Sequence, residues 1–378
     1  MDPSPVTVAV VRSDNRRDAV AQALALIADD LRAVVTPHVL IKPNLVSHKY
    51  QLPSTHRDTL SATLDALLNA GAVQAVVAEG ASDATAGFAR FGYQRETWGR
   101  PVRYLDLNRD EDQWDPLELA AVNGSTNIAR VSRTMASADC RVSLALAKTH
   151  VTAMVTLSLK NMLSSIHPSD RVMMHGHRGG NGYSGWKRLA VEFLKGDNRL
   201  VNVLTRTMGR VRNLRAAWNG ADAADAWRRM SAAEQGYVRS VTVMNRNLVT
   251  LSRRVHPHIS VVDGFVGMHR EGPKHGTPIR LGTVIAGTDP VAVDAVSATL
   301  MGFDPRRIGY LIGAEAAGLG VADLEQIRIV GDPIATVRRR FVPHSNYRLQ
   351  RHWDQPFEPR KSGPHARLMS PEHEAAAR

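Results

Sequence analysis

The segment from Leu144 to Gly180 concentrates side chains capable of acid–base, nucleophilic or metal-binding chemistry. They are Lys148, His150, Lys160, Asn161, His167, His175 and His177. A desolvated lysine can act as a base or a Schiff-base nucleophile, and a protonated lysine can clamp an anion. Lys148 and His150 follow the apolar run VSLALA, so we expect them at the end of a strand, where open α/β sheets bind ligands. The segment is therefore predicted to form part of an active site.

Residues 151–164 have a pattern typical of a helix. Apolar residues at positions 151, 154, 155, 159, 162 and 163 fit one helical face. The other face would carry a polar stripe formed by Thr152, Thr156, Lys160 and Ser164. Such a stripe also fits the solvated side of an ordinary amphipathic helix, but the neighbouring Lys148 and His150 favour a site. Residues 155–160 also alternate like a strand, so a helix is the preferred of two interpretations.

Other polar side chains follow predicted strands elsewhere in the chain. Lys42 and Asn44 flank Pro43 where a buried strand ends, and Glu79 lies on a strand-to-helix turn. Glu271 belongs to the loop MHREGPKHGTP, whose glycines and prolines suit the flexible rim of a site. We expect catalytic roles for Lys160, Lys148, His150 and Glu79. Substrate-binding roles are expected for Lys42, Asn44, Asn161 and Glu271.

A mixed nitrogen–oxygen metal site is a further expectation, because neutral histidine is the commonest transition-metal ligand and carboxylates complete such sites. The HGH sequence places two imidazoles on one side if that stretch is extended. Asp294 lies within the apolar segment VAVDAVSA, where a carboxylate needs a partner or a ligand. No HEXXH motif or comparable spacing is present. A divalent transition metal therefore stays open, with candidate ligands His175, His177, Asp263 and Asp294.

Composition limits the class of protein. Cys140 is the only cysteine, which excludes a disulfide, a thiolate zinc site and a protein-ligated iron–sulfur cluster. No apolar run approaches the roughly 18 residues of a membrane helix, and the N-terminus lacks a signal-peptide pattern, which predicts a cytoplasmic protein. The net charge of +12 suits an anionic partner. Aromatic residues make up only 5% and no nucleic-acid-binding signature occurs, so we expect a small anionic metabolite and do not favour nucleic acid.

Alternating strand and helix patterns in the first third predict an α/β fold with a mostly parallel sheet and crossover helices. Helices are expected at 17–31, at 60–70 with Gly71 as C-cap, and after Asp289 as N-cap. Four parts are predicted: an N-terminal α/β part (1–181), a helical insertion or lid (182–250), a second α/β part that completes the sheet (251–335), and a basic, partly disordered tail (336–378).

The segment AKTHVTAMVTLSLKN resembles the signature of domain-of-unknown-function family 362. The resemblance continues, in the family's order, in IKPNLV (41–46), DGFVGMHREGP (263–273) and GTDPVAVDAVSATLMGFDP (287–305). It implies the α/β fold, but the family has no single established activity. Many members are joined to iron–sulfur ferredoxin modules, and this sequence has no such module.

A more distant similarity is to the nickel-pincer lactate racemase family. His150, Lys160 ten residues later and His175 in a downstream loop follow that family's order. The similarity implies that Lys160 would carry the cofactor and that His175 would ligate nickel. The glycine-rich surroundings of that family's lysine are replaced here by TLSLKN, and EGAS stands in place of its strand-end histidine. We therefore infer from it a shared architecture and pocket position, and not nickel-pincer chemistry.

Together these features predict an enzyme that acts on a small anionic metabolite. Lysine, histidine and carboxylate side chains suit proton transfer at carbon, as in a lyase or isomerase, better than hydrolysis. No Gly-X-Ser-X-Gly motif and no phosphate-binding loop is present. Two alternatives stay open: a redox protein that works with a separate ferredoxin, and a nucleic-acid-binding or non-catalytic protein.

Overall fold

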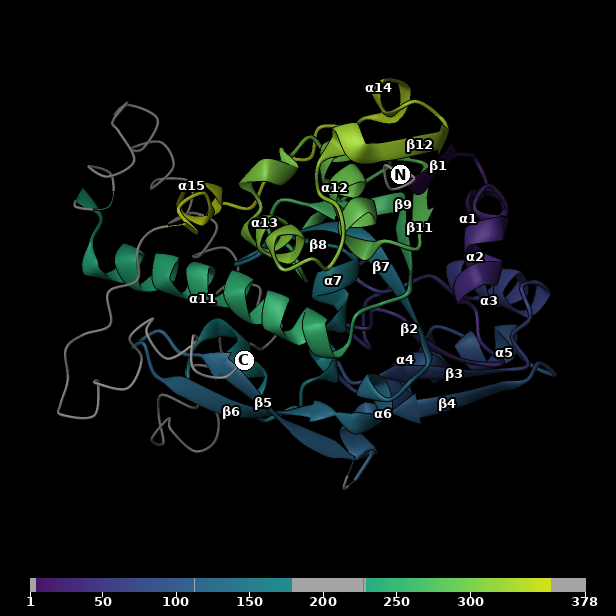
Figure 1. Cartoon of the computed structure of the whole chain (residues 1–378), viewed down its shortest axis with the longest axis horizontal. Helices are drawn as coiled ribbons and strands as arrows, with labels where there is room; N and C mark the ends of the chain where they lie inside the picture. The colour runs from purple at the N-terminus through teal and green to yellow at the C-terminus, as the bar shows by residue number, and fades with distance from the viewer. Residues whose placement is uncertain (1–4, 112, 179–226, 228, 355–378) are drawn as a thin grey trace, which may run out of the picture.

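The computed structural model describes residues 5–111, 113–178, 227 and 229–354 (Figure 1). A central sheet organises this part of the chain. Its strand order is β12 (Ile327–Gly331), β1 (Val6–Arg12), β11 (Thr283–Gly287), β9 (Ile259–His269), β7 (Cys140–His150), β2 (His38–Lys42), β3 (Gln74–Glu79) and β4 (Val102–Asp106). Every strand of this path except β11 runs in the same direction. The predicted α/β fold with a mostly parallel sheet is confirmed.

Helices cover both faces of the sheet because its strands alternate apolar side chains toward two cores. In β1, Val8 and Val10 enter one core while Ala9 and Val11 enter the other. The second core is covered by α1 (Arg16–Ala25), α2 (Ala28–Val34), α3 (Arg57–Asn69), α4 (Ala84–Arg90) and α5 (Tyr93–Glu96). The first is covered by α7 (Ser158–Asn161), α11 (Ala232–Arg254), α12 (Pro290–Leu300) and α13 (Gly309–Ala316).

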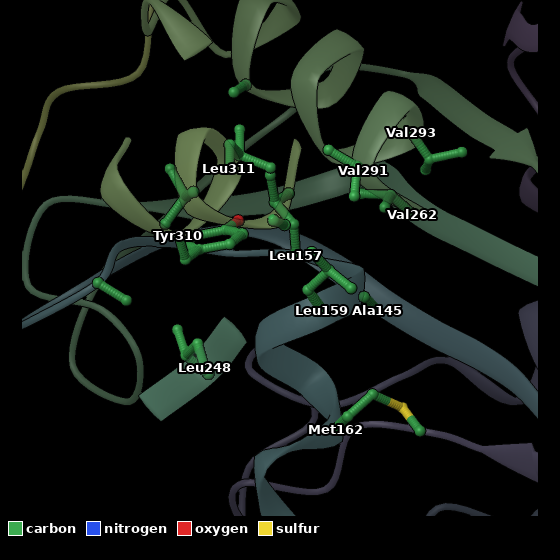
Figure 2. Packing of buried hydrophobic residues seen from close by; sticks show 14 of the residues in the cluster. Ala145, Leu157, Leu159, Met162, Leu248, Val262, Val291, Val293, Tyr310 and Leu311 are labelled. Carbon is green, nitrogen blue, oxygen red and sulfur yellow. The ribbon is translucent and has the colours of Figure 1, made fainter. Parts of the chain in front are cut away.

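Figure 2 shows the first core where α7 meets the sheet. Leu157 and Leu159 lie beside Ala145 and Val262, and Tyr310 and Leu311 cover them from α13. All six side chains are buried. The start of α7 is therefore held between the sheet and the C-terminal helices.

The structure corrects two helix predictions. The helix predicted over residues 17–31 is two helices, α1 and α2, separated at Leu26 and Ile27, and this break accompanies burial of Ile27 and Leu31. The first half of the helix predicted over 151–164 is instead a tight hairpin, in which β8 (Met154–Thr156) pairs with the end of β7. Only α7 and a 3₁₀ turn over Met162–Ser165 are helical there.

Two predicted helix caps are present. Gly71 follows α3 with a φ of +112°, a conformation that favours glycine. The Asp289 carboxylate accepts hydrogen bonds from the backbone N–H groups of Val291 and Ala292 at 2.8 and 2.9 Å, so it is the N-cap of α12.

Smaller elements surround this core. They are β5 (Trp114–Ala120), β6 (Thr126–Ser132), α6 (Arg133–Ala136), β10 (Thr277–Ile279), α14 (Ile334–Val337) and α15 (Tyr347–Gln350). β5 and β6 form a separate antiparallel hairpin beneath α11 (Figure 1). β10 pairs with the end of β9. None of the helices described is long and apolar enough to cross a membrane.

The predicted insertion and tail are described only in part. Residues 182–226 of the insertion lie outside the described residues, and α11 supplies its final part and continues to Arg254. α11 begins with a capping box in which Ser231 and Glu234 satisfy each other's backbone N–H groups. Residues 355–378 of the tail also lie outside. Within residues 336–354, the side chains of Phe341, Leu349 and Gln350 are buried.

Candidate functional site

Neighbouring parallel strands bring the predicted site residues to one edge of the sheet. Lys42 is the last residue of β2, Glu79 the last of β3, and Lys148 lies near the end of β7. Because these strands are parallel and adjacent in the order β7-β2-β3, their carboxyl ends meet. The hairpin and α7 then bring Lys160 and Asn161 to the same edge.

Lys42 and Glu79 form a fully buried ion pair. The Lys42 Nζ lies 3.0 and 3.1 Å from the two carboxylate oxygens, and neither side chain is exposed to solvent. Burial lowers the pKa of Lys42, and the charge of Glu79 opposes this shift. Burial would raise the pKa of Glu79, but the charge of Lys42 and hydrogen bonds to the carboxylate outweigh it, and this pKa is lowered.

The Glu79 carboxylate also accepts four hydrogen bonds from its surroundings. The donors are the backbone N–H groups of Leu45, Gly80 and Ala81 and the Ser164 hydroxyl. Both of its oxygens are therefore occupied, and neither reaches solvent. This arrangement fits a residue that positions the loops after β2 and β3 better than the proton-transfer role expected from the sequence.

Lys148 lies beside this pair and is completely buried. Its Nζ donates to the Asn44 side-chain oxygen and to the Pro53 carbonyl, both at 2.8 Å. Burial, followed by the charge of Lys160, holds the pKa of Lys148 well below the ordinary lysine value. Asn44 in turn donates to the side-chain oxygen of Asn161 at 2.9 Å.

Asn161 connects α7 to two strands. Its side-chain amide donates to the Lys42 carbonyl at 3.1 Å and to the Ser143 hydroxyl at 3.0 Å. The two asparagines and Lys148 thus form one continuous buried network, in which Asn161 ties α7 to the end of β2 and to Ser143 within β7. Their amides are occupied by protein partners, so the geometry gives them a positioning role beside the expected substrate contact.

Lys160 differs from the other two lysines because its amine has no hydrogen-bonding or ion-pair partner among the residues that the structure describes. The side chain is 8% exposed. Burial, with a further contribution from the charge of Lys42, lowers the pKa of Lys160 to about 7. A substantial fraction of the amine is therefore neutral near neutral pH, as a base or nucleophile requires.

His150 ends β7 next to these lysines. Its Nδ1 accepts hydrogen bonds from the backbone N–H groups of Thr152 and Ala153 at 3.0 and 3.1 Å. Burial, then the charges of Lys160 and His175, hold the pKa of His150 well below the ordinary histidine value. The imidazole is consequently neutral at physiological pH.

The predicted metal ligands are not brought together. No group of three or more histidine, cysteine, aspartate or glutamate side chains in the described parts of the chain could hold a metal ion. Asp263 accepts from Thr59 and Phe265 and pairs with Arg16 at 3.0 Å. His177 Nε2 lies 3.3 Å from the Ser240 hydroxyl. His175 ends a 3₁₀ turn over Arg171–His175.

Asp294, another predicted ligand, holds the start of α7 instead. Its carboxylate accepts from the backbone N–H groups of Ser158 and Leu159 at 2.7 and 3.1 Å, and from the Tyr310 hydroxyl at 3.2 Å. Burial raises the pKa of Asp294 to about 7 despite these hydrogen bonds. The sequence correctly required a partner for this carboxylate, but the partner is the helix that carries Lys160.

Replacement of Asp294 by alanine is expected to lower the free energy of unfolding by about 2–4 kcal/mol, because it leaves two buried N–H groups without an acceptor. Tyr310→Phe removes one donor and should cost only about 1 kcal/mol. Urea unfolding measures both. Equal losses in the two variants would contradict a role for Asp294 in holding α7.

Several contributors to the site were not predicted. Ser143, Ser158 and Thr55 carry hydrogen bonds between the strands and loops of the site. Gln350, from the predicted tail, donates to the carbonyl of His150 at 2.7 Å. Glu271, predicted to bind substrate, pairs with His344 at 3.1 Å. Ser164, which donates to the Glu79 carboxylate, was also not predicted as a site residue. It did have a sequence signal, because it belongs to the predicted polar stripe with Lys160.

The chain is similar to three known proteins over part of their lengths. A thylakoid-associated protein of Synechocystis is 31% identical over 116 residues, which cover 31% of this chain and 34% of that protein. The lactate racemase apoprotein from Thermoanaerobacterium thermosaccharolyticum is 14% identical, with a TM-score of 0.43, over 79% of this chain and 57% of that one. A protein from Thermotoga maritima is 10% identical, with a TM-score of 0.42, over 81% and 60%.

The family comparison covers most of the chain. The sequence profile of the family described as "Domain of unknown function (DUF362)" matches residues 39–299. This range contains β2, β3 and β7 with their strand ends, the hairpin, α7 and Asp294. The chain therefore belongs to the DUF362 family.

Proposed function

We propose that this protein is an enzyme that transfers a proton at a carbon atom of a small anionic metabolite, as an isomerase or a lyase does. The observation that carries the proposal is the amine of Lys160. It is buried, has no partner among the described residues, and has a pKa lowered to about 7. A general base is most effective when its pKa is close to the working pH.

The charges at the strand ends favour an anionic substrate. Lys42 and Glu79 neutralise each other, whereas within the described part of the chain Lys148 has only uncharged oxygens as hydrogen-bond partners. Protonation of Lys148 or Lys160 would leave a positive charge in a buried place, and an anion bound beside them would compensate that charge. The carboxylate or phosphate of a small metabolite would therefore bind to the ammonium form of Lys148.

Proton transfer would proceed with the side chains of the protein alone. The neutral amine of Lys160 takes a proton from the carbon next to the substrate's carbonyl or carboxylate group and becomes an ammonium. Return of the proton to that carbon regenerates the substrate and is seen only as exchange with solvent. Delivery of the proton to a different carbon of the anion completes an isomerisation, and loss of a neighbouring leaving group completes an elimination. In the described parts of the chain, the candidate metal ligands do not form a group that could hold a metal ion. Metal assistance would therefore need ligands other than His175, His177, Asp263 and Asp294.

The experiment that tests the proposal is hydrogen–deuterium exchange at substrate carbon. The protein is incubated in D₂O with a panel of small 2-hydroxy, 2-oxo and 2-amino carboxylates and their phosphorylated analogues, and the C–H signals are followed by ¹H NMR. We expect the wild type to exchange a C–H proton of at least one compound and Lys160→Met to exchange none.

A second measurement is needed in case no compound of the panel exchanges a C–H proton. Competitive acetylation across pH 5 to 11, read by peptide mass spectrometry, gives the pH midpoint at which Lys160 becomes reactive. A midpoint near 7 supports the proposed base. A midpoint near 10.5, the ordinary lysine value, together with no exchange in the panel, would overturn the proposed function.

A further inference from the structure

The hairpin after β7 fixes the position of the proton on His150. The turn runs from His150 to Met154, the residues that pair across it, and Met154 has a φ of +68°. Within the turn, the backbone N–H groups of Thr152 and Ala153 both point to His150 Nδ1. A ring nitrogen that accepts hydrogen bonds cannot carry the proton, so the neutral imidazole carries it on Nε2.

The other ring nitrogen is available to a ligand. In the parts of the chain that the structure describes, His150 Nε2 has no hydrogen-bond partner, although the residue is only 5% exposed. Lys160, His175, His344 and Lys148 act electrostatically on His150, and each opposes its protonation. A neutral N–H donor is therefore held within electrostatic range of the amine of Lys160.

We infer that His150 is a neutral hydrogen-bond donor whose Nε2–H binds the substrate oxygen on which negative charge develops. This inference rests on the proposed function and adds to it the group that stabilises the negative charge formed on the substrate's carbonyl or carboxylate oxygen. When the neutral Lys160 amine takes the proton from carbon, the electron pair of the broken C–H bond moves to that oxygen. The resulting enolate oxygen accepts the Nε2–H, and nothing is oxidised or reduced.

The same geometry argues against two other roles of His150. If His150 acted as a base, its Nε2 would need a free lone pair. The same holds if Nε2 were a metal ligand. Either role moves the proton to Nδ1, where it would face the N–H groups of Thr152 and Ala153 instead of accepting from them. Two hydrogen bonds would be lost and two buried donors left unsatisfied, which is costly.

Hydrogen bonds also fix the backbone around His150. The side-chain amide of Gln350 donates to the carbonyls of His150 and Val151, each at 2.7 Å. The Tyr237 hydroxyl also donates to the Val151 carbonyl. Donors from α15 and α11 thus fix the hairpin that aims Nε2, which is what a preorganised oxyanion donor requires. Gln350 and Tyr237 are positioning residues for this reaction.

The test begins with the tautomer, which needs no substrate. Protein labelled with ¹⁵N-histidine is studied by long-range ¹H–¹⁵N correlation NMR, and His150 is assigned by its loss in His150→Asn. We expect the Nε2–H tautomer, unchanged between pH 5.5 and 8.5. A proton on Nδ1, or a titration near the ordinary histidine value of 6.5, would overturn the inference whether or not the protein is an enzyme.

Two variants then separate the donor from the turn. In His150→Asn the side-chain oxygen takes the position of Nδ1 and accepts the turn N–H groups, but nothing replaces Nε2. In His150→Gln an amide nitrogen takes the position of Nε2. We expect His150→Asn to keep the melting temperature and KM while kcat of proton exchange falls about 10²–10³-fold, and His150→Gln to recover part of kcat.

The outcomes of this comparison are distinct. Wild-type kcat in His150→Asn would overturn the donor role. If the wild type exchanges no proton in the panel and Lys160 becomes reactive only near pH 10.5, but His150 shows the Nε2–H tautomer, the proposed function fails while the assigned state of His150 stands.

Discussion

Lys160→Met is expected to lower the rate of proton exchange at least about 10²–10⁴-fold, the usual contribution of a general base. The same change should raise the free energy of unfolding by about 1–4 kcal/mol, because an apolar side chain of similar length replaces a buried amine without a partner. A variant that is more stable but less active would show that the buried amine serves function at a cost in stability.

The pH dependence of both effects follows from the lowered pKa. In the folded protein Lys160 titrates at about 7, whereas in the unfolded chain it titrates near 10.5. Between these values the unfolded state binds more protons, so the contribution of Lys160 to stability becomes less unfavourable as pH rises. The stability advantage of Lys160→Met should therefore be largest below pH 7 and disappear above pH 10.5. Wild-type kcat/KM, which reports the pKa of the ligand-free enzyme, should rise with pH through about 7.

Lys160→Arg is the matched control for charge. Arginine keeps the positive charge but stays protonated, so it can hold an anion but cannot take a proton at neutral pH. We expect Lys160→Arg to bind the substrate anion and to be inactive. Full activity of Lys160→Arg or of Lys160→Met would remove Lys160 from the mechanism, and lower stability of Lys160→Met at pH 6 would mean that the amine has a favourable partner.

The convergence of these side chains at one edge of the sheet was predictable because it depends on strand direction alone. Lys42, Glu79 and Lys148 each follow a buried apolar run, and parallel strands bring such residues to one edge. Short-range patterns also gave the caps at Asp289 and Gly71. These predictions need only the local sequence and the rule that successive parallel strands have crossover helices.

The predictions that were wrong depend on specific pairings between residues. Residues 155–160 fitted both a strand and a helix, and the hairpin is stabilised by pairing of Lys148 with Thr156 and by the ring of His150. Asp294 was correctly recognised as a carboxylate needing a partner, but its partner at Ser158 lies 136 residues away. Periodicity carries no information about such pairs. The residue types alone made a metal ion as good a partner for the Asp294 carboxylate as the backbone of α7.

Glu79→Ala is expected to be the most destabilising single change at the site, by about 3–5 kcal/mol, because it leaves the charge of Lys42 buried without compensation. Lys42→Met should cost a comparable amount, since the carboxylate then retains only uncharged donors. The double variant Lys42→Met/Glu79→Gln removes both charges and should be more stable than Glu79→Ala. Urea unfolding of Lys42→Met, Glu79→Gln and the double variant gives the coupling free energy as a double-mutant cycle.

An exposed ion pair in the same protein provides the control. Arg32 and Asp29 pair on α2 with side chains 58% and 94% exposed, and Asp29→Ala should cost no more than about 1 kcal/mol. A loss in Glu79→Ala no larger than in Asp29→Ala would show that the buried pair is not needed for the fold.

If the loss is large, activity should fall with it, because the backbone N–H groups of Leu45, Gly80 and Ala81 lose their common acceptor. The loops after β2 and β3, which carry Asn44 and face Ser164, would then no longer hold Lys148 and α7 in place. Stability and catalysis are therefore linked through one carboxylate that need never touch the substrate.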